Sequence, residues 1–137
     1  MSARSFLDTN ILVYTDDGGS PEKQAKALEI IERCRSERTG VVSTQVLQEY
    51  FVTVTKKLRV PPEAARRKTE LFGRFNVFRI GLDDVLAAID LHRLHQLSFW
   101  DALVVRIALR SGCSILFSED LQAGRRIDGL EIVNPFS

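Results

Sequence analysis

Apolar residues along the chain follow two spacings, which predict two kinds of secondary structure. Short apolar runs between polar or glycine residues predict buried strands over about residues 5–7, 40–43, 77–80, 114–117 and 130–133. Longer stretches with apolar residues three or four positions apart predict helices that start near residue 11 and cover about residues 21–34, 47–58, 63–72, 83–93 and 99–110. Because strands alternate with helices, we expect an α/β fold with a mostly parallel sheet of about five strands and helices on both faces.

Length and composition fit one folded unit. The chain has 137 residues, 45% of them hydrophobic, so we expect a single domain over residues 1–137 with its own core. Its longest apolar run has five residues, 85–89, too few for a membrane-spanning helix. Asp8 interrupts the first apolar cluster, which argues against a signal peptide, and the isolated Cys34 and Cys113 suit a reducing compartment. We therefore expect a cytoplasmic protein without a membrane partner.

Charge is distributed unevenly, although the net charge is only +1. Residues 33–79 carry 11 basic and 4 acidic side chains, whereas the segments before and after them are both net acidic. A basic middle between acidic ends could bind a polyanion with one region and cations with another. The same counts also fit ordinary solvated helix faces.

Four acidic side chains are placed where the predicted topology puts a ligand site. Asp8 directly follows the first strand, and Asp120 closely follows the fourth. Glu49 lies about two turns into the helix after the second strand, and Asp101 lies in the first turn of the helix before the fourth strand. Ligands of open α/β sheets bind at the carboxyl ends of the strands. Glu49 and Asp101 also interrupt apolar stretches, where a buried carboxylate needs a partner or a metal ion.

Each acid also has a purely structural interpretation. Asp8 could cap the following helix, and Ser98-x-x-Asp101 matches a capping box. Glu49 could point to solvent, and Asp120 could cap a turn. Singly these interpretations are sufficient, but together they must explain why several acids fall near one edge of the sheet.

Four segments resemble, in order and spacing, the motifs of PIN-domain nucleases. They are residues 6–12 (FLDTNIL), 43–49 (STQVLQE), 100–104 (WDALV) and 118–121 (SEDL). The resemblance covers essentially the whole chain, and the size is similar to that of the small VapC-type toxins of toxin–antitoxin pairs.

The resemblance implies a three-layer PIN-like fold and a ribonuclease that depends on Mg²⁺ or Mn²⁺. The implied catalytic and metal-binding residues are Asp8, Glu49, Asp101 and Asp120, and the implied supporting polar residues are Thr9, Asn10 and Ser118. The fourth motif often has a neutral residue where this chain has Glu119, so Glu119 could add a fifth carboxylate or point away. A VapC-type protein would bind an RNA substrate and a cognate antitoxin, and would form a homodimer.

The chemistry agrees with these residue types. Mg²⁺ and Mn²⁺ are hard cations that prefer carboxylate oxygen and water as ligands. The number of ions stays open, as does a role for Glu49 in orienting or deprotonating the attacking water. Because an acidic site repels RNA, nearby cations are needed to hold the backbone, and the candidates are Lys56, Lys57, Arg66 and Arg67.

Other functions fit the same residues less well. A receiver domain needs an acidic pair after the first strand, and a haloacid-dehalogenase-like phosphatase needs Asp-x-Asp there; this chain has Asp8-Thr9-Asn10. His92-x-x-His95 spans one helical turn but has no further His or Cys nearby in the sequence for zinc. Trp100 is expected in the core, because it enters an apolar helix. Two alternatives remain open: an inactive PIN-like module for RNA binding or assembly, and an RNA-processing nuclease that is not a toxin.

Overall fold

The strands lie in one mixed sheet in the computed structural model, which describes residues 3–137. The sheet has the order β3-β2-β1-β4-β6-β5. The strands are β1 (Arg4–Leu7), β2 (Gly40–Ser43), β3 (Asn76–Phe78), β4 (Cys113–Phe117), β5 (Arg126–Ile127) and β6 (Leu130–Val133). All neighbouring strands are parallel except β5, which pairs antiparallel with β6. The expected mostly parallel sheet is confirmed.

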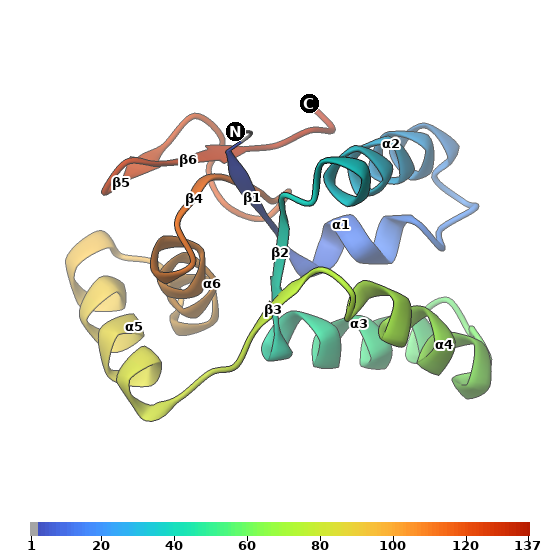
Figure 1. The fold of residues 1–137 in the computed structure, drawn as a ribbon, viewed down its shortest axis with the longest axis horizontal. Coiled ribbons are helices and arrows are strands. Elements are labelled where there is room, and N and C mark those ends of the chain that lie inside the picture. The colour runs from blue at the N-terminus through green and yellow to red at the C-terminus, as the bar shows by residue number, and fades with distance from the viewer. Residues whose placement is uncertain (1–2) are drawn as a thin grey trace.

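Helices cover both faces of this sheet. They are α1 (Thr9–Tyr14), α2 (Pro21–Glu37), α3 (Thr44–Lys56), α4 (Pro62–Phe72), α5 (Leu82–His95) and α6 (Phe99–Arg110). In Figure 1, α1 to α4 lie on one side of the strands, and α5 and α6 lie on the other. The three-layer arrangement is therefore also confirmed.

The side chains of the central strand β1 show that the sheet is buried on both faces. Phe6 and Leu7 are fully buried although successive strand side chains point to opposite faces. Their burial requires helices above and below, as is usual for parallel sheets. The neighbouring strands β2 and β4 place Val41, Val42 and Leu116 in the same core.

Two details of the sheet differ from the sequence-based prediction. The third strand was expected over residues 77–80 but is Asn76–Phe78. Its last pair is Phe78 with Ser43, and pairing stops there because Ser43 also caps α3 through its hydroxyl group. The short strand β5 was not predicted.

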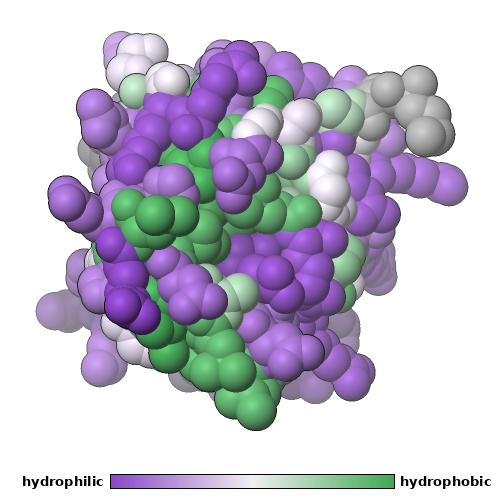
Figure 2. Space-filling view, turned by 90° about the vertical axis from the view of Figure 1, so that its left-hand side faces the viewer, coloured by the Kyte–Doolittle hydropathy of each residue, from purple (hydrophilic) through white to green (hydrophobic). Residues whose placement is uncertain are grey.

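The outer face of α5 carries exposed aliphatic side chains. Leu82, Leu86 and Ile89 recur at helical spacing and are 71%, 51% and 40% exposed. Figure 2 shows hydrophobic surface on the side of the molecule that includes α5. None of the helices within residues 3–137 has the length and apolar character needed to cross a membrane.

Candidate functional site

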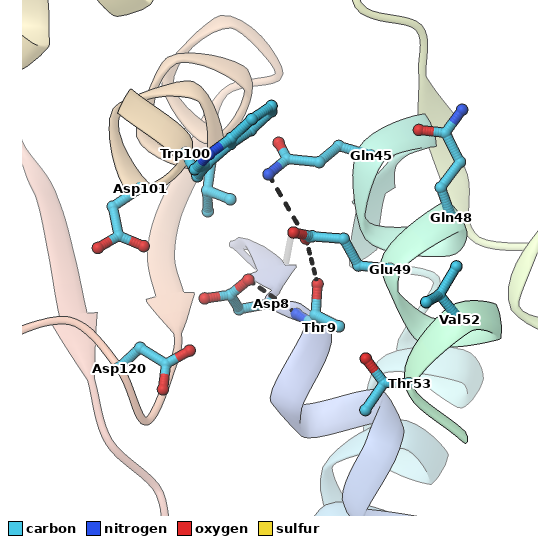
Figure 3. A pocket seen from close by; sticks show the side chains of 11 residues that line it. Asp8, Thr9, Gln45, Gln48, Glu49, Val52, Thr53, Trp100, Asp101 and Asp120 are labelled. Atoms are coloured by element: carbon cyan, nitrogen blue, oxygen red, sulfur yellow. Dashed lines mark hydrogen bonds between the residues drawn. The ribbon is translucent and has the colours of Figure 1, made fainter. Parts of the chain in front are cut away.

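A pocket of about 400 Å³ lies at the carboxyl ends of the central strands. Four of its lining residues are acidic, namely Asp8, Glu49, Asp101 and Asp120. Figure 3 shows them on three sides of the pocket, with Asp8 following β1, Glu49 on α3 and Asp101 on α6. The structure thus brings together all four acids that the sequence singled out.

The pairing of β1 with β4 fixes the position of Asp8. Leu7 pairs with Phe117, so Asp8 and Ser118 leave their strands side by side. The Ser118 hydroxyl donates a hydrogen bond of 2.7 Å to Asp8 Oδ2, and the Thr9 amide donates one of 2.8 Å to Asp8 Oδ1. Asp8 therefore caps α1, as its structural interpretation required, while its carboxylate also lines the pocket.

The negative charge of the pocket carboxylates is not neutralised by basic side chains within the described residues. Burial raises the pKa of Asp8 to about 6, and the charges of Asp120 and Asp101 add to this effect, against the hydrogen bonds from Ser118 and Thr9. Burial also raises the pKa of Asp101, again with a contribution from Asp120. No lysine or arginine lines this pocket within the described residues. The carboxylates therefore repel one another without a neighbouring protein cation.

Polar neighbours hold the other two acids in place. The Thr9 hydroxyl donates a 2.8 Å hydrogen bond to Glu49 Oε1, and Gln45 Nε2 donates a longer one of 3.4 Å to the same atom. Asn10 Nδ2 donates to Asp120 Oδ2 at 3.1 Å. The side chains of the implied supporting residues Thr9, Asn10 and Ser118 thus each donate a hydrogen bond to one of the four acids.

Glu119 points away from the pocket and does not add a fifth carboxylate. It accepts hydrogen bonds of 2.6 Å from both the Tyr14 hydroxyl and the Lys23 ammonium group. Burial alone would raise the pKa of Glu119, but these two donors outweigh it and hold the pKa below its usual value. Glu119 therefore ties the loop after β4 to α1 and α2.

The N-terminal turn of α6 presents Asp101 to the pocket. The Ser98 hydroxyl accepts a 3.1 Å hydrogen bond from the Asp101 amide, so half of the suspected capping box is present. The Asp101 carboxylate itself lines the pocket. Ser98 can therefore cap α6 while Asp101, in the first turn of the same helix, lines the pocket.

Trp100 and Gln45 are among the pocket residues that were not recognised from the sequence. Trp100 is 62% exposed and lines the pocket, so its expected place in the core is wrong. The physical reason is that the first turn of α6 extends beyond the packed interior, which begins at Ala102. Gln45 is only 6% exposed and also lines the pocket, but a glutamine at the start of a helix gives no sequence signal for this.

The candidate RNA-binding cations lie outside the pocket. Lys56, Lys57, Arg66 and Arg67 are exposed, and none of them forms a salt bridge within residues 3–137. Arg66 lines a neighbouring groove between α3 and α4 that shares Gln48 and Val52 with the acidic pocket.

The acidic pocket has suitable chemistry for a hard divalent cation. Its acidic lining side chains offer only oxygen atoms, and the buried Asp8 has no positively charged partner among residues 3–137. The four carboxylates do not form a complete set of metal ligands by themselves, since no group of three His, Cys, Asp or Glu residues in the described part of the chain is arranged to hold a metal ion.

One ring nitrogen of the His92–His95 pair is already engaged. His92 Nδ1 donates a hydrogen bond to the Leu97 carbonyl oxygen.

Comparison with known proteins assigns the class of the fold. The sequence matches the PIN domain family over residues 5–129, and the chain therefore belongs to this family.

Three solved structures are similar in fold. A toxin–antitoxin complex from Klebsiella pneumoniae is 21% identical, with 96% of this chain and 97% of that chain covered and a TM-score of 0.73. Mycobacterium tuberculosis VapC20, a toxin that cleaves the sarcin–ricin loop, is 17% identical, with coverage of 85% and 89% and a TM-score of 0.67. VapBC2 from Rickettsia felis, bound to promoter DNA, is 21% identical, with coverage of 93% and 96% and a TM-score of 0.67. No curated protein sequence matches the chain.

Proposed function

We propose that this chain is a single nuclease domain that hydrolyses RNA phosphodiester bonds with Mg²⁺ or Mn²⁺, as the toxin of a VapBC-type pair. The observation that carries the proposal is the cluster of four carboxylates at the carboxyl edge of a PIN-family sheet, with no lysine or arginine among the described residues that line the pocket. The similarity in fold to toxin–antitoxin proteins supports the toxin role.

Asp8, Asp101 and Asp120 would hold the ion, with Glu49 beside them. Mg²⁺ in proteins commonly keeps several waters and takes only one or two carboxylates together with substrate phosphate, so a closed protein cage is not required. When bound, such an ion supplies a Lewis acid that lowers the pKa of water and neutralises charge on the phosphate.

Glu49 is the residue best placed to handle a proton. Its Oε1 atom accepts hydrogen bonds from Thr9 and Gln45, which fixes the direction of the carboxylate. The second oxygen, Oε2, has no hydrogen-bond partner among the side chains described. In the proposed reaction Oε2 orients the attacking water and accepts its proton, while the 3′ oxygen leaves.

The RNA backbone would extend from the pocket over α3 and α4. Arg66 lies in the groove that continues from the pocket, and Lys56, Lys57 and Arg67 add exposed positive charge on the same two helices and at the end of α3. These cations would offset the repulsion between RNA and the acidic pocket.

Two protein partners complete the proposal. An antitoxin would cover the acidic pocket and block access of RNA to it. A second copy of the chain would pack on the exposed face of α5, which has the exposed Asp83 in its first turn and the exposed Arg93 in its last. An antiparallel pair of α5 helices would place the acidic end of each against the basic end of the other.

The experiment is an RNA cleavage assay with the purified chain and its Asp101→Asn variant. Cleavage should require Mg²⁺ or Mn²⁺, should stop in excess EDTA, and should fall by at least about 100-fold in the variant. Expression of the wild-type chain in a bacterial host should arrest growth, and the variant should not. Undiminished cleavage in EDTA would contradict the metal mechanism, and cleavage without growth arrest would favour an RNA-processing enzyme. Metal-independent RNA binding without cleavage would identify an inactive PIN-like module.

A further inference from the structure

We infer that the pocket contains a subsite for one unpaired nucleobase, in which the Trp100 indole stacks on the base and the Gln45 carbonyl oxygen accepts a hydrogen bond from an amino group of that base. This inference rests on the proposed function, because it takes the substrate of the pocket to be RNA. It assigns a preference for a base with an exocyclic amino group (adenine, cytosine or guanine) over uracil beside the carboxylates.

The first observation is an unsatisfied buried acceptor. Gln45 is 6% exposed, and its Oε1 atom has no hydrogen-bond partner within the described residues. A buried polar atom without a partner costs about 1 to 3 kcal/mol, so such atoms usually mark a position where a ligand or water binds. Gln45 lines the pocket, and in Figure 3 its amide end is turned toward the α6 side, where Trp100 lies.

The orientation of the Gln45 amide is fixed by its neighbour. Gln45 Nε2 donates to Glu49 Oε1, so the amide nitrogen faces the carboxylate. Rotating the amide by half a turn would place its carbonyl oxygen against the carboxylate oxygen, and two acceptors repel each other. The carbonyl oxygen is therefore the atom that Gln45 presents to a ligand.

The second observation is an aromatic surface on the opposite wall. Trp100 is the only tryptophan of the chain, and 62% of its surface is exposed although it is the largest apolar side chain in the pocket. Phe99 packs against it edge to face, with ring centroids 5.2 Å apart and planes at 77°, which restrains the indole. A restrained and exposed aromatic ring is suited to stack on a base that has left its own strand.

These two groups together define the ligand. A lone acceptor selects a donor, and an exocyclic amino group supplies one on adenine, cytosine and guanine. Uracil and hypoxanthine have no exocyclic amino group. They carry a carbonyl oxygen where cytosine and adenine carry theirs, and would set acceptor against acceptor there. Stacking on Trp100 requires an unpaired base, so the substrate is single-stranded RNA or a loop.

The single tryptophan makes the inference directly measurable. The probes are the pentanucleotides UUCUU and UUUUU and the UU-abasic-UU analogue, titrated against the full chain in EDTA so that no metal-dependent cleavage occurs. UUCUU should quench Trp100 fluorescence and bind about five- to tenfold more tightly than UUUUU, the effect expected for one hydrogen bond to a buried acceptor. The abasic analogue should bind more weakly than both without quenching.

Two glutamines provide a matched pair of variants. Gln45→Leu keeps the side-chain size but removes the acceptor, and should bind UUCUU and UUUUU with equal affinity. Gln122→Leu changes an exposed glutamine that lines neither the pocket nor the neighbouring groove, and should keep the five- to tenfold preference. Trp100→Phe keeps a smaller ring and should weaken UUCUU binding by calorimetry without lowering the melting temperature. If Gln45→Leu does not fold, the affinities of the wild-type protein for the three probes still show whether the base subsite exists.

The outcomes separate this inference from the proposed function. Equal affinity of wild-type protein for UUCUU and UUUUU, or a preference that survives in Gln45→Leu, would overturn the subsite. Fluorescence unchanged by every RNA, in a chain that cleaves RNA with Mg²⁺, would overturn it while leaving the nuclease intact. The predicted preference in a chain that never cleaves RNA would retain the subsite and remove the nuclease.

Discussion

Asp8 is the most buried of the four pocket acids, with 5% of its surface exposed. Its folded-state pKa of about 6 lies above the value of about 3.9 expected in an unfolded chain. The folded protein therefore holds a proton on Asp8 in a pH range where the unfolded chain has lost it. The resulting stabilisation is complete below about pH 4 and is lost as pH rises through 6. At pH 8 the ionised Asp8 lowers the free energy of unfolding by about 3 kcal/mol, from about 1.4 kcal/mol per pKa unit.

Asp8→Asn should consequently raise the melting temperature of the metal-free protein at pH 8. The gain should shrink at pH 5, where wild-type Asp8 is largely protonated. Addition of 10 mM Mg²⁺ should raise the melting temperature of the wild type more than that of the variant, because the variant lacks a proposed ligand. Thermal melts with EDTA and with Mg²⁺ measure all three effects, and Asp90→Asn, on the exposed surface of α5, is the control. An equal Mg²⁺ shift in wild type and Asp8→Asn would remove Asp8 from the metal site.

Single residues also show how much of the candidate site could be predicted from the sequence. The acids were recognisable because each follows a strand end or interrupts an apolar stretch, and the PIN-like motifs contain all four. The direction of Glu119 was not recognisable, because it depends on Tyr14 and Lys23 approaching from elsewhere in the fold. The unsatisfied acceptor of Gln45 likewise exists only in the folded chain, where the Gln45 side chain is buried.

At the scale of elements, Asp84 joins α5 to α6. Its carboxylate accepts hydrogen bonds from Arg106 Nε at 3.0 Å, Arg110 Nε at 2.8 Å and the Gly81 amide at 2.9 Å. Burial alone would raise the pKa of Asp84, but these donors outweigh it and lower the pKa. The ionised form is therefore the one that holds the two helices together.

Asp84→Asn should lower the free energy of unfolding at pH 7 by about 2 to 3 kcal/mol, somewhat less than for a fully buried ion pair because both arginines are partly exposed. A lowered pKa gives stability above the unfolded value of about 3.9 that is lost as pH falls through the folded value. The two proteins should therefore differ less at pH 3 than at pH 7 in urea unfolding. Asp83→Asn, at the exposed neighbouring position, should have little effect. A constant difference at both pH values would show that the charge of Asp84 is not responsible.

Element boundaries were predictable where a local signal ends them. Ser98 starts α6 as expected, and Gly112, with a φ of 78°, follows the end of that helix. The missed strand β5 also had a signal, since Asp128-Gly129 between Ile127 and Leu130 is a common hairpin sequence. Both turn residues have positive φ, 50° and 89°, as such a tight turn requires. The end of β3 lacked a local signal, because it depends on where its partner β2 stops.

At the scale of the molecule, the order of the strands could not be read from the sequence. Alternating strands and helices predict a parallel sheet but not that β1 lies between β2 and β4. This order brings Asp8 and Ser118 together across 110 residues of chain. The motif resemblance supplied the candidate site residues, whereas the arrangement of their contacts required the fold.

The basic middle of the chain leads to a prediction about RNA binding. Removing one cation that binds a phosphate of a single strand should reduce the slope of log affinity against log salt by about 0.7. Arg66→Ala should show this change, since Arg66 lines the groove that continues from the pocket. Filter binding to a single-stranded RNA in EDTA over a range of salt concentrations gives the slope. Arg33→Ala, which removes an exposed arginine from α2, is the control, and equal slopes for the two variants would mean that the RNA does not follow this groove.

The exposed face of α5 leads to a prediction about assembly. Burying a leucine side chain contributes about 1.5 to 3 kcal/mol, and a two-fold interface uses each α5 residue twice. Leu86→Lys should therefore remove about 3 kcal/mol or more from the free energy of dimer formation. Because each 1.4 kcal/mol is a factor of ten, the dimer dissociation constant should rise by at least about 100-fold. Sedimentation velocity over a range of protein concentrations measures the change. Leu28→Lys alters a leucine of similar exposure on α2 and should leave the dimer intact. A wild type that stays monomeric throughout, or equal weakening by both variants, would exclude α5 as the interface between copies.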